Sequence, residues 1–428
     1  MSSVTGRQPP ARSRARDLGI APGRLPTGPA NAITDVPGIR VGHATVIEGT
    51  GIRTGVTAIV HDVLLPGSLQ HLRWQHGGPQ QGRSREAGGG TLPAGLSVFN
   101  GFGKMVGSTQ VAELGTIETP VLLTATLSVF RVADALLSYL RALNYRREGH
   151  GGELPGTLNP VVAETNDGYL SDIWARPITA EHVRIALDTA AGGPVAEGCV
   201  GAGTGTGALG FKAGIGTSSR IVGWATGPVT LGVLVQANFS GELTVLGVPV
   251  PATGREMAPE PPDHGNSCVI VLATDAVLDS RQLERVASRA FAGMARAGSD
   301  FSGGSGDYAL AISTAPPATA ARQTAAGGLS AAVTEATGAG QAAEGGATET
   351  TAASAAAPGA DTAPAGYPVP GKDLDLLFQA AAEATEEAIL NSLFMAVTTT
   401  GFRGRVRHAV SLDEVVARLG ARLTRPSS

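Results

Sequence analysis

The segment PPDHGNSCVIVLATDA (261–276) joins a polar loop to an apolar strand. The loop contains proline and glycine and ends at Asn266, and Ser267 opens an apolar run rich in β-branched residues. Such a run, bounded by turn residues, predicts a buried strand. On this feature alone, an ordinary loop entering a buried strand explains the pattern.

Further strands and helices are predicted on either side of this segment. Apolar runs bounded by Gly or Pro predict strands over 55–65, 95–101, 119–130 and 230–240. Helical spacing of apolar residues predicts helices over 132–143, over 283–294, which Asp279 and Gln282 open at capping-box spacing, and from 374 to 388 and beyond. Strands interleaved with helices imply a layered α/β architecture.

Amino-acid composition changes along the chain and divides it into segments. With 428 residues, 42% of them hydrophobic and 16% charged, the chain can bury a sizeable core. We expect an N-terminal arm (1–30) followed by a single catalytic domain (31–428). Within that domain, 315–368 consists mostly of Ala, Gly, Thr, Pro and Glu, which predicts a flexible low-complexity insertion.

Charge and cysteine content narrow the class of partner and the compartment. The net charge is −4 and no dense basic stripe occurs, so we expect no nucleic-acid partner. Cys199 and Cys268 lie in no metal-ligand or CxxC spacing, and no run of eighteen apolar residues occurs. We therefore expect a cytoplasmic protein without a membrane partner, a metal or an organic cofactor.

Two familiar kinds of functional motif are not supported. The glycine-rich stretch GAGTGTGALGFKAGIGTSSR (201–220) has neither Walker spacing nor an acidic ribose contact, so tight turns explain it better than a phosphate site. The eight histidines are scattered, and we assign none of them to catalysis.

The Asn266–Ser267 junction also allows a reaction that needs no histidine. If the Ser267 hydroxyl attacked the Asn266 carbonyl, an N-to-O acyl shift and hydrolysis would leave Ser267 as a new N-terminus. Its α-amine, with an ordinary pKa of about 7.7–8.0, could then act as the base for its own hydroxyl.

Many ordered blocks make this chain resemble the DmpA family of L-aminopeptidases/D-esterases and β-peptidyl aminopeptidases. The blocks cover nearly the whole chain outside the low-complexity tract. They are RARDLGI (14–20), NAITDVPGIRVGHAT (31–45), GIRTGVTAI (51–59), ELGTIETPVLLT (113–124), AETNDGYLSDI (163–173), VGAGTGTGALGFKAGIGTSSR (200–220), GVLVQANFSG (232–241), SCVIVLATDA (267–276) and GGSGDYALAIST (303–314).

The resemblance implies a fold and a cleavage. It implies a four-layer αββα sandwich of the type shared with ornithine acetyltransferase, similar to N-terminal-nucleophile hydrolases. It also implies self-cleavage between Asn266 and Ser267 into an α part (1–266) and a β part (267–428), which stay together in a homo-oligomer of αβ units. The implied activity is that of a serine aminopeptidase or amidase on short peptides, amino-acid amides or esters.

Carried over residue by residue, the resemblance makes Ser267 the nucleophile and Asn238 the oxyanion donor. Ser305 would hydrogen-bond the Ser267 amine or hydroxyl, and Asp307 would hold that network. Tyr169 would line the pocket and donate its hydroxyl to substrate or intermediate. Turn caps and a turn-edge aromatic are the ordinary alternatives for the last four residues. Cys268, next to Ser267, is an alternative nucleophile, but its side chain would point to the opposite face of the strand, as a small buried hydrophobic residue does.

Substrate choice and reaction class stay open at this level. Glu113, Asp167 or Asp307 could each face the free amine of a substrate. The family commonly has LTNT where this chain has LTAT, so Ala125 removes an amide side chain. An acyltransferase of the ornithine-acetyltransferase type, or a catalytically silent scaffold of the same fold, are the alternatives to a hydrolase.

Overall fold

Two β-sheets form the centre of the molecule. The computed structural model describes residues 12–66, 90–148, 156–224, 227–252, 266–315, 371–420 and 423. Almost all of the predicted insertion (315–368), and residues 1–11 of the arm, lie outside the described residues.

The first sheet has the order β1-β2-β6-β7-β4 and is antiparallel except where β6 pairs with β7. Its strands are β1 (Arg40–Glu48), β2 (Ile52–Val60), β6 (Val121–Ala125), β7 (Val161–Thr165) and β4 (Met105–Val106).

The second sheet has the order β10-β11-β14-β15-β3-β5 and is antiparallel except where β14 pairs with β15. Its strands are β10 (Ile215–Val222), β11 (Val229–Asn238), β14 (Asn266–Thr274), β15 (Ser305–Ser313), β3 (Leu92–Gly101) and β5 (Thr116–Ile117).

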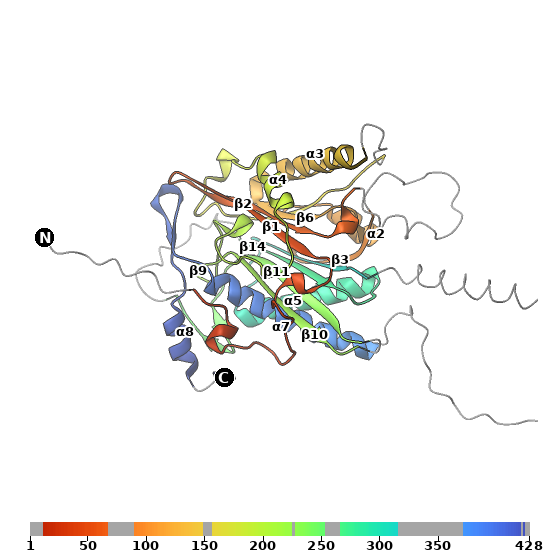
Figure 1. The fold of residues 1–428 in the computed structure, drawn as a ribbon. Helices are drawn as coiled ribbons and strands as arrows, with labels where there is room; N and C mark the ends of the chain where they lie inside the picture. The colour runs from red at the N-terminus through yellow and green to blue at the C-terminus, as the bar shows by residue number, and fades with distance from the viewer. Residues whose placement is uncertain are drawn as a thin grey trace, which may run out of the picture.

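Helices cover the outer face of each sheet. The helices α3 (Val129–Glu148) and α4 (Ala180–Asp188) pack on the first sheet, and α5 (Ser280–Ala297) and α7 (Gly371–Phe394) pack on the second (Figure 1). The structure therefore has the predicted αββα layers. The smaller elements are α2 (Ser108–Leu114), α8 (Leu412–Leu419), the hairpins β8 (Gly207–Ala208)/β9 (Phe211–Lys212), β12 (Thr244–Val245)/β13 (Val248–Pro249) and β16 (Thr399–Thr400)/β17 (Val406–Arg407), and the 3-10 turns Arg16–Leu18, Ile33–Asp35, Asp62–Leu64, Thr126–Ser128, Ile173–Ala175, Gly201–Gly203 and Phe402–Gly404.

The apolar run of β14 is explained by burial of both of its faces. Cys268 and Ile270 belong to the core under α5 and α7, whereas Val269 and Val271 belong to the core between the two sheets. Successive side chains of a strand point to opposite faces. A strand covered on both sides therefore needs no polar alternation.

Most predicted elements form, with different ends. The capping box of Asp279 and Gln282 opens α5 as predicted. The predicted strands 55–65 and 119–130 were too long, because β2 ends at Val60 and β6 ends at Ala125. The chain then turns into 3-10 helices, so apolar residues continue beyond the strand without a change in composition.

The glycine-rich stretch serves close packing, as the turn interpretation predicted. A Cβ atom on Gly214 would lie 1.8 Å from the carbonyl oxygen of Gly198, and one on Gly216 would lie 1.9 Å from that of Ala388 in α7. Only glycine lets backbones approach this closely.

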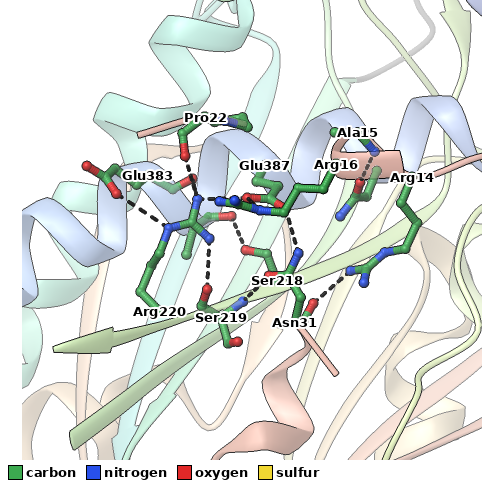
Figure 2. A network of polar contacts seen from close by, with 12 residues as sticks. Arg14, Ala15, Arg16, Pro22, Asn31, Ser218, Ser219, Arg220, Glu383 and Glu387 are labelled. Atoms are coloured by element: carbon green, nitrogen blue, oxygen red, sulfur yellow. Dashed lines mark hydrogen bonds and ion pairs between the residues drawn. The ribbon is translucent and has the colours of Figure 1, made fainter. Parts of the chain in front are cut away.

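The described part of the N-terminal arm is tied to α7 by buried charge (Figure 2). Glu387 accepts hydrogen bonds from Arg16 Nε (2.9 Å), Asn31 Nδ2 (2.5 Å) and Arg220 Nη2 (2.8 Å). Arg220 on β10 is completely buried and also reaches Glu383 Oε2 at 3.4 Å. We refer to Arg16, Asn31, Arg220, Glu383 and Glu387 as the arm network.

Candidate active site

Ser267 lies at the start of β14, in the middle of the second sheet. Its side chain is 3% exposed. Its Oγ donates a hydrogen bond to the carbonyl oxygen of Asn266 at 2.5 Å and accepts one from the N–H of Gly306 at 3.3 Å. Since a carbonyl bond is about 1.23 Å long, the Asn266 carbonyl carbon lies within about 3.7 Å of that Oγ. The hydroxyl is thus close to attacking distance of the bond before it.

Asn238, the last residue of β11, is the direct cross-strand partner of Ser267. Cross-strand partners share a face of the sheet, so both side chains point toward the first sheet. The Asn238 Oδ1 accepts the N–H of Gly207 at 3.1 Å, and its Nδ2 donates to the carbonyl of Asn166 at 2.9 Å. Two backbone contacts therefore orient this amide beside the serine.

Tyr169 follows β7 in the same turn as Asn166, opposite Asn238. Its ring is half-buried and lies under the guanidinium groups of Arg407, at 4.5 Å, and Arg405, at 5.4 Å. Burial lowers the pKa of Arg407. The β16/β17 hairpin thus fixes the ring by cation–π contacts.

Ser305 and Asp307 form a second polar pair on β15, the other neighbour of β14. The Ser305 hydroxyl donates to Asp307 Oδ1 at 2.6 Å, and burial raises the pKa of Asp307 to about 6. In the parallel register Asn266 pairs with Ser305, and Cys268 pairs with Asp307. By alternation, Ser305 and Asp307 share the face of Asn266 and Cys268, whereas Ser267 faces the other way.

This arrangement brings the five predicted residues to one end of β14, divided between its two faces. Ser267, Asn238 and the turn that carries Tyr169 lie on the side of the first sheet, and Ser305 and Asp307 lie on the side of α5. Cys268 is completely buried and points away from Ser267 into the core under α5 and α7, as predicted. Burial raises the pKa of its thiol, which suits a small core residue rather than a nucleophile.

The three acidic candidates for amine recognition are placed differently. Glu113 is exposed on α2, and α2 packs on β3. Asp307 pairs with Asn100 at the other end of that strand. Asp167 is buried between Asn166 and Tyr169, and burial raises its pKa to about 7. The structure thus leaves Asp167 and Asp307, and not Glu113, near Ser267.

Glu164 on β7 was missed by the sequence argument. It is 1% exposed, and burial raises its pKa although the Lys104 ammonium lies 3.4 Å away. It precedes Asn166 by two residues in the block ETNDGYL, from which the sequence indicated only Asp167 and Tyr169. Its position at the end of a strand beside a candidate site residue was the available signal.

A family model matches most of the chain. The model of peptidase family S58 matches residues 31–69 and 82–407.

The chain belongs to peptidase family S58.

Curated relatives extend the S58 match. Beta-peptidyl aminopeptidase BapA of Sphingosinicella microcystinivorans is 36% identical over 92% of this chain and 90% of its own length. The protein of the same name from Sphingosinicella xenopeptidilytica is 40% identical over 71% of this chain and 74% of its own length.

Solved structures agree with the S58 fold. The Burkholderia sp. beta-aminopeptidase is 36% identical, with a TM-score of 0.70 over 97% of this chain and 100% of its own. The L-aminopeptidase D-Ala-esterase/amidase of Ochrobactrum anthropi is 33% identical, with a TM-score of 0.71 over 96% of this chain and 99% of its own. That structure is described as a prototype of the serine aminopeptidases with a variant of the Ntn hydrolase fold. This S58 chain is thus a hydrolase of the aminopeptidase type with an Ntn-like sandwich, as the sequence resemblance predicted.

Proposed function

We propose that this chain cuts its own Asn266–Ser267 bond and then acts as a serine aminopeptidase or amidase on short peptides, amino-acid amides or esters. The contact of 2.5 Å between Ser267 Oγ and the Asn266 carbonyl oxygen carries the proposal. A serine aimed at the carbonyl of its own peptide bond, at the start of a buried central strand, is arranged for an acyl shift.

The cleavage proceeds by two substitutions at one carbon. Ser267 Oγ bonds to the Asn266 carbonyl carbon, the carbon–nitrogen bond breaks, and the hydroxyl proton passes to the leaving amine. Water then adds to the resulting ester. Its hydroxyl stays on Asn266 as a carboxylic acid, its proton returns to Oγ, and Ser267 is left with a free amine.

The freed residue then contains both nucleophile and base. The Ser267 amine takes the hydroxyl proton as Oγ attacks a substrate carbonyl, and Asn238 donates to the oxygen on which negative charge develops. Because Ser305 lies on the opposite face from the hydroxyl, its contact would be to the amine rather than to Oγ. Asp307, bonded to Ser305, would stabilise the protonated amine. Tyr169 would line the acyl pocket from the first sheet.

Recognition of the substrate amine would come from buried carboxyl groups on the first sheet. Glu164 and Asp167 stand on either side of Asn166, which binds Asn238. A substrate ammonium would favour their ionised forms against the cost of burial. This places the charged end of the substrate opposite the nucleophile and favours an exopeptidase.

A cytoplasmic location and a homo-oligomer of αβ units also remain proposals. Both cysteines of the chain, Cys199 and Cys268, are free thiols, which suits a reducing compartment. In the described residues, no helix is long and apolar enough to cross a membrane. Light scattering of the purified protein would give the number of subunits.

The first prediction tests the proposed function with adjacent substitutions. Ser267→Ala should leave one uncut, inactive polypeptide, because it removes the hydroxyl that attacks the Asn266 carbonyl. Cys268→Ala is the matched control, and it should be cut and active. Denaturing gels, N-terminal sequencing of the smaller band and turnover of an amino-acid p-nitroanilide measure both results. Two bands from Ser267→Ala would refute the assignment, and an added acceptor amine would separate hydrolysis from transfer.

A further inference from the structure

The side chain of Asn266, the residue before the proposed cut, is held from two other loops. Its Nδ2 donates to Ser240 Oγ at 2.8 Å and to Ser302 Oγ at 3.1 Å. A primary amide has two N–H donors, so these contacts can use both. Ser240 follows Asn238 on one side, and Ser302 precedes Ser305 on the other.

Asp300 orients the two serines. Ser240 Oγ donates to Asp300 Oδ1 at 2.7 Å, and the N–H of Ser302 donates to the same oxygen at 3.2 Å. The N–H of Asp300 in turn bonds to the carbonyl of Ser240 at 3.4 Å. Since the Ser240 hydroxyl proton is given to the carboxylate, its lone pairs are directed to the Asn266 amide.

We propose that Ser240 and Ser302, oriented by Asp300, form a clamp that positions Asn266 for self-cleavage. This inference rests on the proposed function. The clamp fixes the Asn266 Nδ2, which is four bonds from the carbonyl carbon, so it limits movement of that carbonyl away from Ser267 Oγ. Attack requires the reacting atoms within about 3–3.5 Å, and small misplacements are costly in rate.

The clamp also determines which group attacks. An unrestrained asparagine amide can attack its own carbonyl: the nitrogen–carbon bond forms, the peptide carbon–nitrogen bond breaks, and a cyclic imide results while the next residue leaves as an amine. That route would cut the same bond without Ser267. Two hydrogen bonds to distant loops hold Nδ2 away from this path, so the α part should end in an open Asn266 carboxylate.

A coupling experiment tests the clamp. We expect Asn266→Ala and the pair Ser240→Ala/Ser302→Ala each to slow cutting by about tenfold or more, because each removes the same contacts. Combining all three changes should slow cutting no further than Asn266→Ala alone, since residues that act through one contact are not additive. The single change Ser302→Thr keeps a hydroxyl at this position, so this variant should be cut at about the wild-type rate. Time courses of freshly synthesised full chain on denaturing gels give these rates.

Turnover of the cut enzyme separates positioning from general damage. Once fully cut, the Ser240→Ala/Ser302→Ala enzyme should keep its kcat/KM on a p-nitroanilide within about threefold, because the hydroxyls that it removes hydrogen-bond Asn266 and Asp300 rather than any of the five site residues. Ser288→Ala, at a half-buried position of α5 whose hydroxyl donates to the carbonyl of Arg285 in the same helix, is the matched control and should change neither rate.

The outcomes distinguish the two proposals. If Ser267→Ala stays uncut while the double serine variant is cut at the wild-type rate, the clamp is overturned and the proposed function stands. Additive slowing in the triple variant would also overturn the clamp. If Ser267→Ala is still cut and the α part is lighter by one water, the bond breaks by cyclisation of Asn266, and the proposed function fails first.

Discussion

In the proposed mechanism, Asn238 is the residue on which transition-state stabilisation would depend most directly. Its amide is oriented by Gly207 and Asn166 before any substrate binds. A donor preorganised in this way stabilises developing charge without reorganisation.

We therefore expect Asn238→Ala to lower kcat by about 10²–10³, as removal of one oxyanion donor does elsewhere, with a smaller change in KM. The measurement is steady-state kinetics, corrected for the cut fraction. Asn159→Ala, which alters an amide bonded to Glu118 away from the site, is the control. An unchanged kcat for Asn238→Ala would remove this residue from the mechanism.

We expect Asp307, through its hydrogen bond with Ser305, to give the cleavage of the uncut chain a pH dependence. Burial raises its pKa to about 6, so the group is largely protonated below that pH and ionised above it. The ionised carboxylate accepts the Ser305 hydroxyl proton at Oδ1 in a charge-assisted hydrogen bond, which is stronger than the bond to the protonated form. The cutting rate should therefore rise as pH increases through about 6 and then level off.

The Asp307 prediction is checked by rates of cutting measured between pH 5 and 8 on freshly synthesised chain. Asp307→Glu, which retains a titrating carboxyl group, should keep a rising limb, whereas Asp307→Asn should lose it. The free energy of unfolding should change in the opposite direction to the cutting rate. A carboxyl group with a raised pKa in the folded protein contributes stability at low pH, and this stability is lost as pH rises through about 6. A rate that falls between pH 5 and 7 would contradict the role.

Three of the described histidines, His43, His61 and His182, make local structural contacts. The Nδ1 of His43 forms a hydrogen bond with Thr57 Oγ1 at 3.0 Å. Burial lowers the pKa of His43 to about 4, so its ring stays neutral. His61 and His182 accept backbone N–H groups at helix starts. These three residues support local structure.

At the level of elements, α7 is the helix through which the arm and the second sheet are joined. It packs on β10 and β11, and its buried Glu387 receives three donors of the arm network. Arg220 has no exposed surface, so its charge depends on the two glutamates.

Glu387→Gln should therefore destabilise the protein by about 3–5 kcal/mol, the usual cost of removing one partner from a buried ion pair. Glu181→Gln, in the exposed pair with Arg184 on α4, is the control and should leave the unfolding midpoint nearly unchanged. Denaturant unfolding of both variants makes the comparison. If the Glu387→Gln and Glu181→Gln variants had equal unfolding midpoints, the arm network would contribute little to stability.

In the whole molecule, the proposed cut separates parts that are interleaved. The strands β14 and β15 belong to the β part, yet they lie between β11 and β3 of the α part. The arm network joins Arg16 and Arg220 of the α part to Glu383 and Glu387 of the β part. Both sheet hydrogen bonds and buried charge therefore cross the two products.

The two polypeptides of the cut protein should therefore stay together as one complex. We expect the α and β parts to elute together in a 1:1 ratio from size exclusion in native buffer, and to separate only in denaturant. Mass spectrometry of the eluted fractions gives the ratio. Separation of the parts in native buffer would mean that the interleaved sheet is not enough to hold them.

Much of this protein can be predicted from its sequence. Local patterns gave the strand after Asn266, the capped start of α5 and the helical face of α7, because burial and capping impose periodic and positional rules on neighbouring residues. The ordered blocks pointed to the αββα fold and to Ser267, Asn238, Ser305, Asp307 and Tyr169 as site residues.

Tertiary structure alone decided the rest. It put Ser305 and Asp307 on the opposite face from Ser267, removed Glu113 from the site, and joined Asn266 to Ser240 and Ser302. Each of these outcomes depends on strand register and on contacts between residues far apart in the chain. A shift of one residue in register reverses every side chain, and local sequence does not specify that shift.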